Sequence, residues 1–162
     1  MNYKNLFSLN KKKIYIFGSS GLLGREISKA FLSVGATVIG FDIKNKNKRK
    51  IKNFIFNKLD LSDHYTVDKN LKFYFKRYGV PDVFINCSWP RTAKWTSLNF
   101  SNMKIDDFKE NLDINLNSYV FSSRSVANEM VKKKINGSII LLGSTYGIVG
   151  QNLAVYKGTK MR

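Results

Sequence analysis

The clearest chemical signature in the sequence is the heptapeptide Gly18-Ser19-Ser20-Gly21-Leu22-Leu23-Gly24, in which three glycines recur at three-residue spacing. It lies between a short apolar run, residues 14–17, and a segment whose apolar residues recur at helical spacing. Glycine allows a tight turn and lets a phosphate approach the backbone, and the free N–H groups of a helix N-terminus attract an anion. The pattern therefore predicts a pyrophosphate site. We expect its contacts to come from Gly18, Ser20, Gly21, Leu22, Leu23 and Gly24.

A carboxylate stands where a ribose would be recognised. Asp42 ends a second apolar run, residues 37–41, about 20 residues after the glycine turn. An aspartate in this position accepts hydrogen bonds from ribose hydroxyls and repels a 2′-phosphate, so the predicted cofactor is NAD and NADP is disfavoured. Lys44 and the basic loop after it weaken that preference, because a cation there could bind a phosphate. The alternative interpretation is that Asp42 only shapes a turn.

These residues must be positioned by the elements around them, and strand-like and helix-like segments alternate along the chain. Crossovers of this length require a parallel sheet with helices on both faces. The predicted fold class is therefore α/β, a doubly wound, Rossmann-like parallel sheet, with residues 1–162 forming one NAD(P)-binding domain. We expect strands at residues 14–17, 37–41, 54–56, 83–85 and 138–142, and helices at 22–34, 62–78 (capped by Ser62) and 106–133.

Composition excludes several classes of protein. A hydrophobic fraction of 43% is too high for a disordered chain, and a single cysteine excludes a disulfide-stapled scaffold. No apolar run is long enough to span a bilayer and no secretory signal is present, so we expect a cytoplasmic protein without a membrane partner. One histidine, His64, and one cysteine, Cys87, predict no metal site.

The net charge of +17 raises a separate hypothesis, a basic module that binds nucleic acid. Lysines form three clusters, within residues 11–13, 44–52 and 132–134, and these fall on predicted loops and helix ends. A charge run of this kind usually forms a solvated surface. We therefore expect a small-molecule substrate and no nucleic-acid partner.

Other segments follow the glycine turn in the order that one enzyme family has them. Leu59-Asp60-Leu61 follows the third predicted strand, Asn86-Cys87-Ser88 the fourth, and Gly143-Ser144-Thr145 the fifth. With these segments the chain resembles the short-chain dehydrogenase/reductase family from Lys13 onward. The resemblance implies that Asp60, beside Leu61, positions the adenine ring and that Asn86 belongs to the cofactor site. Ser88 departs from the family's Asn-Ala-Gly.

The resemblance also implies a reaction, transfer of a hydride between nicotinamide and an alcohol or ketone. Ser144 is the counterpart of the serine that orients the substrate oxygen, and Asn115 of the asparagine that supports a water chain. A tyrosine serves as acid and base, and a lysine four residues later lowers its pKa. Tyr156 and Lys160 have this spacing, which places both side chains on one face of a helix.

Two interpretations of Tyr156 and Lys160 stay open. In the first they are the catalytic pair. In the second, residues 151–162 form an inserted loop that mimics the motif, and the catalytic tyrosine comes later. Pro90-Arg91-Thr92 and Tyr146-Gly147 resemble members that modify bacterial surface glycans or flagellin, in which such a loop occurs. That narrower resemblance implies a sugar-derived substrate.

The family resemblance also bears on the length of the chain. Family members continue well beyond the fifth strand, so we expect the sheet to be truncated there and this chain to be inactive by itself. The full-length protein is expected to be a homo-oligomer. The alternative is a non-catalytic dinucleotide-binding fragment or remnant. Trp89, Arg91 and Trp95 either wall a substrate pocket or pack a loop on the sheet edge.

Overall fold

The computed structural model describes residues 7–46, 50–95, 101–150 and 152–159. These residues form a parallel five-stranded sheet in the order β3-β2-β1-β4-β5, which confirms the predicted fold class. The strands are β1 (Lys13–Phe17), β2 (Thr37–Asp42), β3 (Phe54–Lys58), β4 (Val83–Asn86) and β5 (Ser138–Leu141). The helices are α1 (Leu22–Ser33), α2 (His64–Tyr78), α3 (Ile105–Leu112) and α4 (Ser118–Lys132), with a π-helix η2 (Asp113–Asn117) and the 3-10 turns η3 (Thr145–Gly147) and η4 (Leu153–Tyr156).

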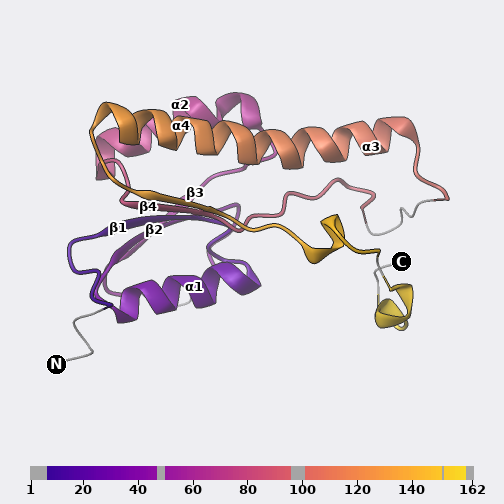
Figure 1. The fold of residues 1–162 in the computed structure, drawn as a ribbon, viewed down its shortest axis with the longest axis horizontal. Helices are drawn as coiled ribbons and strands as arrows, with labels where there is room; N and C mark the ends of the chain where they lie inside the picture. Colours follow the sequence, from indigo (N-terminus) through magenta and orange to yellow (C-terminus); the bar gives the residue numbers. More distant parts are fainter. Residues whose placement is uncertain (1–6, 47–49, 96–100, 151, 160–162) are drawn as a thin grey trace.

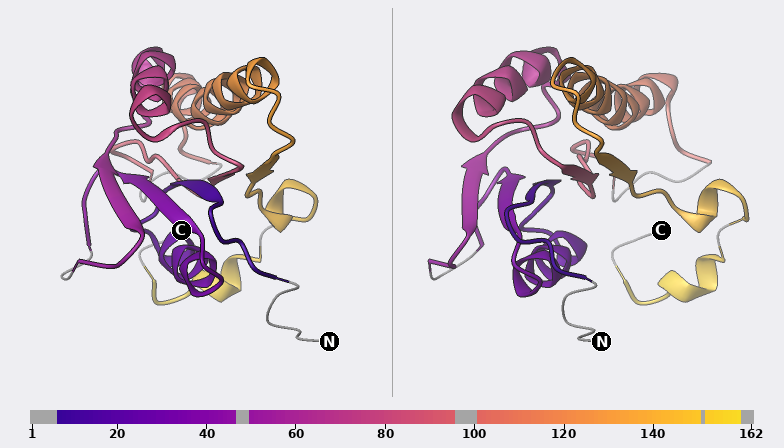
Figure 2. Two further views of the ribbon diagram at one scale, coloured as in Figure 1. Left: turned by 90° about the vertical axis from the view of Figure 1, so that its left-hand side faces the viewer. Right: turned by 60° about the vertical axis from the view of Figure 1, so that its left-hand side comes forward.

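The sheet separates two layers of helices. Helix α1 covers one face, α2 and α4 lie over the other, and α3 continues the line of α4 beyond the ends of the strands (Figure 1, Figure 2). Strand side chains alternate between the faces, so Tyr15 and Phe17 of β1 pack toward α2 and α4, and Ile14 and Ile16 pack toward α1. All four are fully buried, which makes β1 the centre of the core.

Coverage of the sheet differs from the sequence prediction at one edge. The described part of the connection from β2 to β3 contains no helix, in line with the basic loop predicted after Asp42. The expectation of helices on both faces holds over β1 and β2 but fails at β5, where Ile140 and Leu141 are 43% and 47% exposed. The physical reason is that β5 is an edge strand and the described segment after it forms only 3-10 turns.

Helix boundaries also differ from the prediction. Helix α2 begins at His64, and Asp63 occupies the N-cap position that was expected for Ser62; the Ser62 hydroxyl donates to Asp60 Oδ1 at 2.7 Å. The long helix predicted at 106–133 spans 105–132, but the π-helix η2 interrupts it. Apolar spacing does not reveal one inserted residue, because the stripe continues on both sides of it.

The topology brings the functional loops together. All strands run in parallel, so the loops after β1, β2, β4 and β5 leave the same edge of the sheet (Figure 1). Ligands of such open sheets bind outside these carboxyl ends. Across the described residues, none of the helices combines the length and apolar character that a membrane crossing needs.

Candidate nucleotide-binding site

The glycine turn is anchored to its neighbouring strand by the backbone. The N–H groups of Gly18 and Ser19 donate to the carbonyl of Phe41 at 2.9 and 3.1 Å, and Gly21 N–H donates to the Gly18 carbonyl at 2.9 Å. Gly18 has φ of 76°, a conformation that a side chain would strain. The predicted tight turn is therefore present between β1 and α1.

Close packing explains two of the three glycines. A Cβ on Gly18 would lie 2.8 Å from the Cys87 carbonyl oxygen and Ser88 Cα, so the turn rests directly on the loop after β4. A Cβ on Gly24 would lie 2.1 Å from the Gly18 carbonyl oxygen, which fixes α1 against the turn. At Gly21 the nearest atom would be 3.1 Å away, a much milder contact.

The polar groups of the turn fit a phosphate ligand. Ser19 and Ser20 are 1% and 2% exposed, and among the described residues neither hydroxyl has a hydrogen-bond partner. No side chain caps the N-terminus of α1, so its first N–H groups remain available to an anion. Leu22 and Leu23 flank this position and are 77% and 57% exposed. Sequence reasoning missed the packing role of Ser19, whose hydroxyl lies against β2, where a Cβ on Gly40 would be 2.6 Å from it.

The Asp42 carboxylate accepts hydrogen bonds from backbone N–H groups, as an aspartate that shapes a turn does. Its Oδ2 accepts from Ser20 N–H at 2.9 Å, and its Oδ1 accepts from Ile43 N–H at 2.8 Å. The carboxylate therefore bridges the end of β2 and the glycine turn. Each carboxylate oxygen keeps a further lone pair, so these contacts leave room for ribose hydroxyls.

The other predicted cofactor residues lie at the same edge. Asp60 follows β3, and its Oδ1 accepts from the Ser62 N–H and hydroxyl at 2.9 and 2.7 Å, while Leu61 beside it is buried. Asn86 ends β4 and is fully buried. Its Oδ1 accepts from the Ser88 N–H and hydroxyl at 3.1 and 2.6 Å, so its contacts shape the loop after β4.

Two predicted catalytic residues are held by local hydrogen bonds. Ser144 is exposed after β5, and its Oγ accepts from Tyr146 N–H at 3.2 Å, which leaves its own O–H free to donate. Asn115 lies within η2, and its Nδ2 donates to the Asn111 carbonyl at 3.0 Å. The structure thus gives Asn115 an intrahelical partner that the sequence did not predict.

The described residues around Tyr156 form no α-helix, which the first interpretation of Tyr156 and Lys160 needs and the second does not. Tyr156 ends the 3-10 turn η4, and a turn with positive φ at Gly158 follows it. Lys160 lies outside the described residues. A hydrogen bond to Tyr156 raises the pKa of Tyr146, so the two tyrosines adjoin. The described part of the segment is therefore loop-like.

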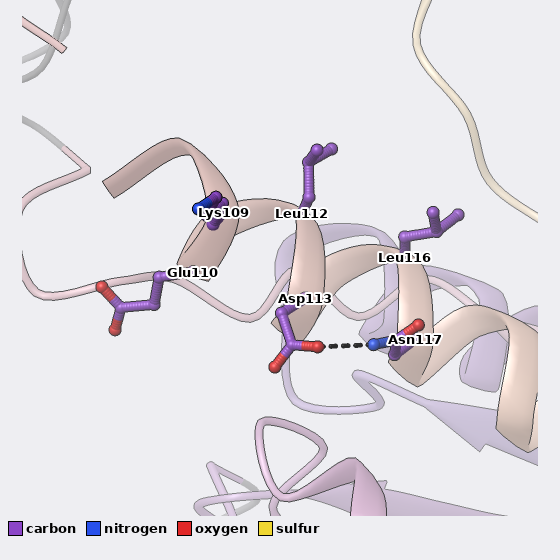
Figure 3. A pocket seen from close by; sticks show the side chains of 6 residues that line it. All are labelled: Lys109, Glu110, Leu112, Asp113, Leu116 and Asn117. Carbon is purple, nitrogen blue, oxygen red and sulfur yellow. Dashed lines mark hydrogen bonds between the residues drawn. The ribbon is translucent and has the colours of Figure 1, made fainter. Parts of the chain in front are cut away.

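A shallow surface depression lies apart from the glycine turn, on the α3–η2 segment. Leu112 and Leu116 project to one side of it, and Asp113 accepts a hydrogen bond from Asn117 at 2.6 Å (Figure 3). None of the predicted cofactor or catalytic residues lines this depression. Across the described residues, His, Cys, Asp and Glu form no cluster that could hold a metal ion.

Sequence comparisons place these features in one family. The family model for short chain dehydrogenases matches residues 12–161. A 3-oxoacyl-(acyl-carrier-protein) reductase of Buchnera aphidicola is 32% identical over 146 residues, covering 86% of this chain and 58% of the relative. Post-translational flagellin modification protein A of Campylobacter coli is 23% identical, and the match covers 95% of this chain and 63% of the relative. The chain thus spans about three fifths of the length of these relatives.

Solved structures agree with the fold. A short chain dehydrogenase from Leptospira borgpetersenii with bound NAD+ superposes with a TM-score of 0.81 at 24% identity, covering 96% of this chain and 59% of that one. A 4-hydroxyisoleucine dehydrogenase complexed with NADH superposes with a TM-score of 0.74 at 27% identity, covering 93% of this chain and 63% of that one. Together with the family match and the glycine turn, they confirm the resemblance seen in the sequence: the chain belongs to the short-chain dehydrogenase family.

Proposed function

We propose that this chain is the cofactor-binding part of an NAD-dependent oxidoreductase that interconverts an alcohol and a ketone. The observation that carries the proposal is the glycine turn, with the buried, unpartnered Ser20 hydroxyl and the uncapped N-terminus of α1. The NAD+ and NADH bound by the two structural neighbours support the choice of cofactor. When bound, the nicotinamide would exchange a hydride with the substrate carbon.

The chain's own residues have separate roles in this proposal. The Ser20 hydroxyl and the first N–H groups of α1 bind the phosphates, and Asp42 accepts from the ribose hydroxyls. Asp60 and Leu61 contact the adenine side, and Asn86 holds the loop after β4 beside the turn. Because a carboxylate repels a 2′-phosphate, Asp42 selects NAD over NADP.

For the chemical step, we propose that Ser144 donates its free O–H to the substrate oxygen and that Asn115 supports the proton pathway. The acid–base residue is a tyrosine, either Tyr156 after rearrangement of η4 or a tyrosine beyond residue 162. The loop-like conformation around Tyr156 favours the second choice. A sugar-derived substrate stays a proposal that rests on the narrower resemblance at Pro90-Arg91-Thr92 and Tyr146-Gly147; one relative is named a post-translational flagellin modification protein. Cytoplasmic location and a homo-oligomeric full-length protein stay predictions.

Calorimetric titration of the purified chain with NADH and NADPH tests the proposal. We expect NADH to bind more tightly than NADPH. Asp42→Asn should weaken NADH binding about tenfold and narrow the difference between the cofactors, because it removes charge-assisted hydrogen bonds to the ribose. Glu129→Gln is the matched control, since it removes one negative charge at the opposite end of the fold, late in α4. Equal affinity for both cofactors, or no binding of either, would contradict the proposal.

A further inference from the structure

The loop after β4 gathers two tryptophans around one arginine. The rings of Trp89 and Trp95 meet edge to face, with centroids 4.7 Å apart and planes inclined at 67°. Cζ of Arg91 lies 5.2 Å from the Trp89 ring centroid and 4.8 Å from that of Trp95. We call these three residues the tryptophan corner. Both contacts are within the range of a cation–π interaction, so the corner fixes the guanidinium in place.

The tryptophan corner is held at both ends of its loop. Before it, the Ser88 carbonyl accepts from the Tyr119 hydroxyl of α4 at 2.8 Å. Within it, Lys94 forms an ion pair with Asp107 of α3 at 3.0 Å, and the Asp107 side chain is only 9% exposed. The loop therefore presents Arg91 from a fixed base, with the restricted Pro90 directly before it.

The loop leaves the sheet between the two segments that the proposed chemistry uses. Strand β4 lies between β1 and β5, so the loop lies between the glycine turn and the segment that carries Ser144. Contact with the turn is direct, because Gly18 has no room for a Cβ against Ser88. The tryptophan corner thus starts from the edge of the sheet where cofactor and substrate must meet.

Arg91 has the properties of an anion receptor. Its side chain is exposed, and within the described residues it forms no ion pair. The nearby lysine, Lys94, is already paired with Asp107. Guanidinium remains charged at all working pH values and offers a planar edge of N–H donors that matches a carboxylate or a phosphate. The two indole centroids are about as far from each other as from Cζ, so both rings lie on one side of the guanidinium and its other side stays open to a ligand.

We propose that Arg91 in the tryptophan corner binds an anionic group, carboxylate or phosphate, of the substrate. That the anion belongs to a substrate rests on the proposed function, but the anion site itself does not depend on cofactor binding. Arg91 then selects for acidic alcohols or ketones, because a neutral analogue leaves the guanidinium unpaired.

The chain contains only two tryptophans, and both belong to the corner. Tryptophan emission therefore reports on this site alone. Inorganic phosphate and acetate are titrated separately at constant ionic strength, with chloride as the replaced anion. We expect a saturable change in emission, and the probe that saturates at lower concentration identifies the anion class. Arg91→Gln should weaken the apparent affinity about tenfold to hundredfold, and Arg91→Lys should recover part of it.

A matched control and a second measurement complete the test. Arg77→Gln removes another arginine stacked on a ring, that of Tyr78 in α2, and should leave the titration unchanged. NADH affinity, measured by calorimetry, should be the same in Arg91→Gln and the unmodified chain. No anion response in a chain that binds NADH, or an Arg91→Gln response equal to that of the unmodified chain, would overturn the inference. A loss of NADH affinity in Arg91→Gln would also overturn it, by assigning the arginine to the cofactor. An anion response without NADH binding would support the anion site and refute the cofactor proposal alone.

Discussion

Replacing Ser20 by alanine should raise stability and lower cofactor affinity at the same time. Ser20 is 2% exposed and its hydroxyl has no partner among the described residues. A buried hydroxyl without a hydrogen bond costs about 1–3 kcal/mol, so its removal should increase the free energy of unfolding by about 1 kcal/mol. The same hydroxyl is proposed to donate to a cofactor phosphate. Its loss should therefore weaken NADH binding by about 1–1.5 kcal/mol, roughly tenfold.

Ser28 provides a matched comparison in the adjoining helix. It is also buried, 4% exposed, but its hydroxyl donates to the Gly24 carbonyl at 2.6 Å. Ser28→Ala removes a hydrogen bond that is formed in the free protein, so it should lower the free energy of unfolding by about 1 kcal/mol. NADH affinity should stay unchanged, because the proposed site does not include this hydroxyl.

Urea unfolding followed by circular dichroism measures the two changes in stability, and calorimetric titration with NADH measures the affinities. If Ser20→Ala raises the free energy of unfolding and Ser28→Ala lowers it, the result agrees with the role of the unpartnered Ser20 hydroxyl as a ligand group. The reasoning is refuted if Ser20→Ala destabilises the chain as Ser28→Ala does and leaves NADH affinity intact.

Two further predictions concern packing and pH. Gly24→Ala should lower the free energy of unfolding by about 1–3 kcal/mol and weaken NADH binding, because its Cβ would lie 2.1 Å from the Gly18 carbonyl oxygen. Gly147→Ala, where a Cβ meets nothing within 4 Å, is the control in the same urea and calorimetric measurements. Burial raises the pKa of the Cys87 thiol from 9.0 to about 11, so iodoacetamide should modify it far more slowly in the folded chain than in urea. Folding favours the protonated thiol, so this contribution to stability is full below pH 9 and is lost as the pH rises toward 11. Between pH 9 and 11 the free energy of unfolding in urea should fall less steeply for Cys87→Ala than for the unmodified chain. An equal fall in both proteins would contradict the raised pKa of the Cys87 thiol.

Much of the fold could be predicted because its signals are local. Apolar runs of strand length and the helical spacing after Gly21 predicted β1, α1 and the parallel sheet. The π-helix η2 could not be predicted, since one inserted residue leaves the apolar stripe nearly intact. The sequence left open whether Tyr156 and Lys160 share a helical face, because i, i+4 spacing is a necessary condition for such a face and not evidence that a helix forms; the described residues around Tyr156 form a 3-10 turn.

The sequence by itself determined the family, the order of the elements and the glycine turn, because residue type and spacing restrict the backbone at those positions. Tertiary structure alone decided which groups lack a partner. It buried the hydroxyls of Ser19 and Ser20 without hydrogen bonds, and it paired Lys94 with Asp107. It also stacked Arg91 on two indoles contributed by the same loop. Whether a polar group is satisfied depends on atoms distant along the chain, and only the folded arrangement brings those atoms together.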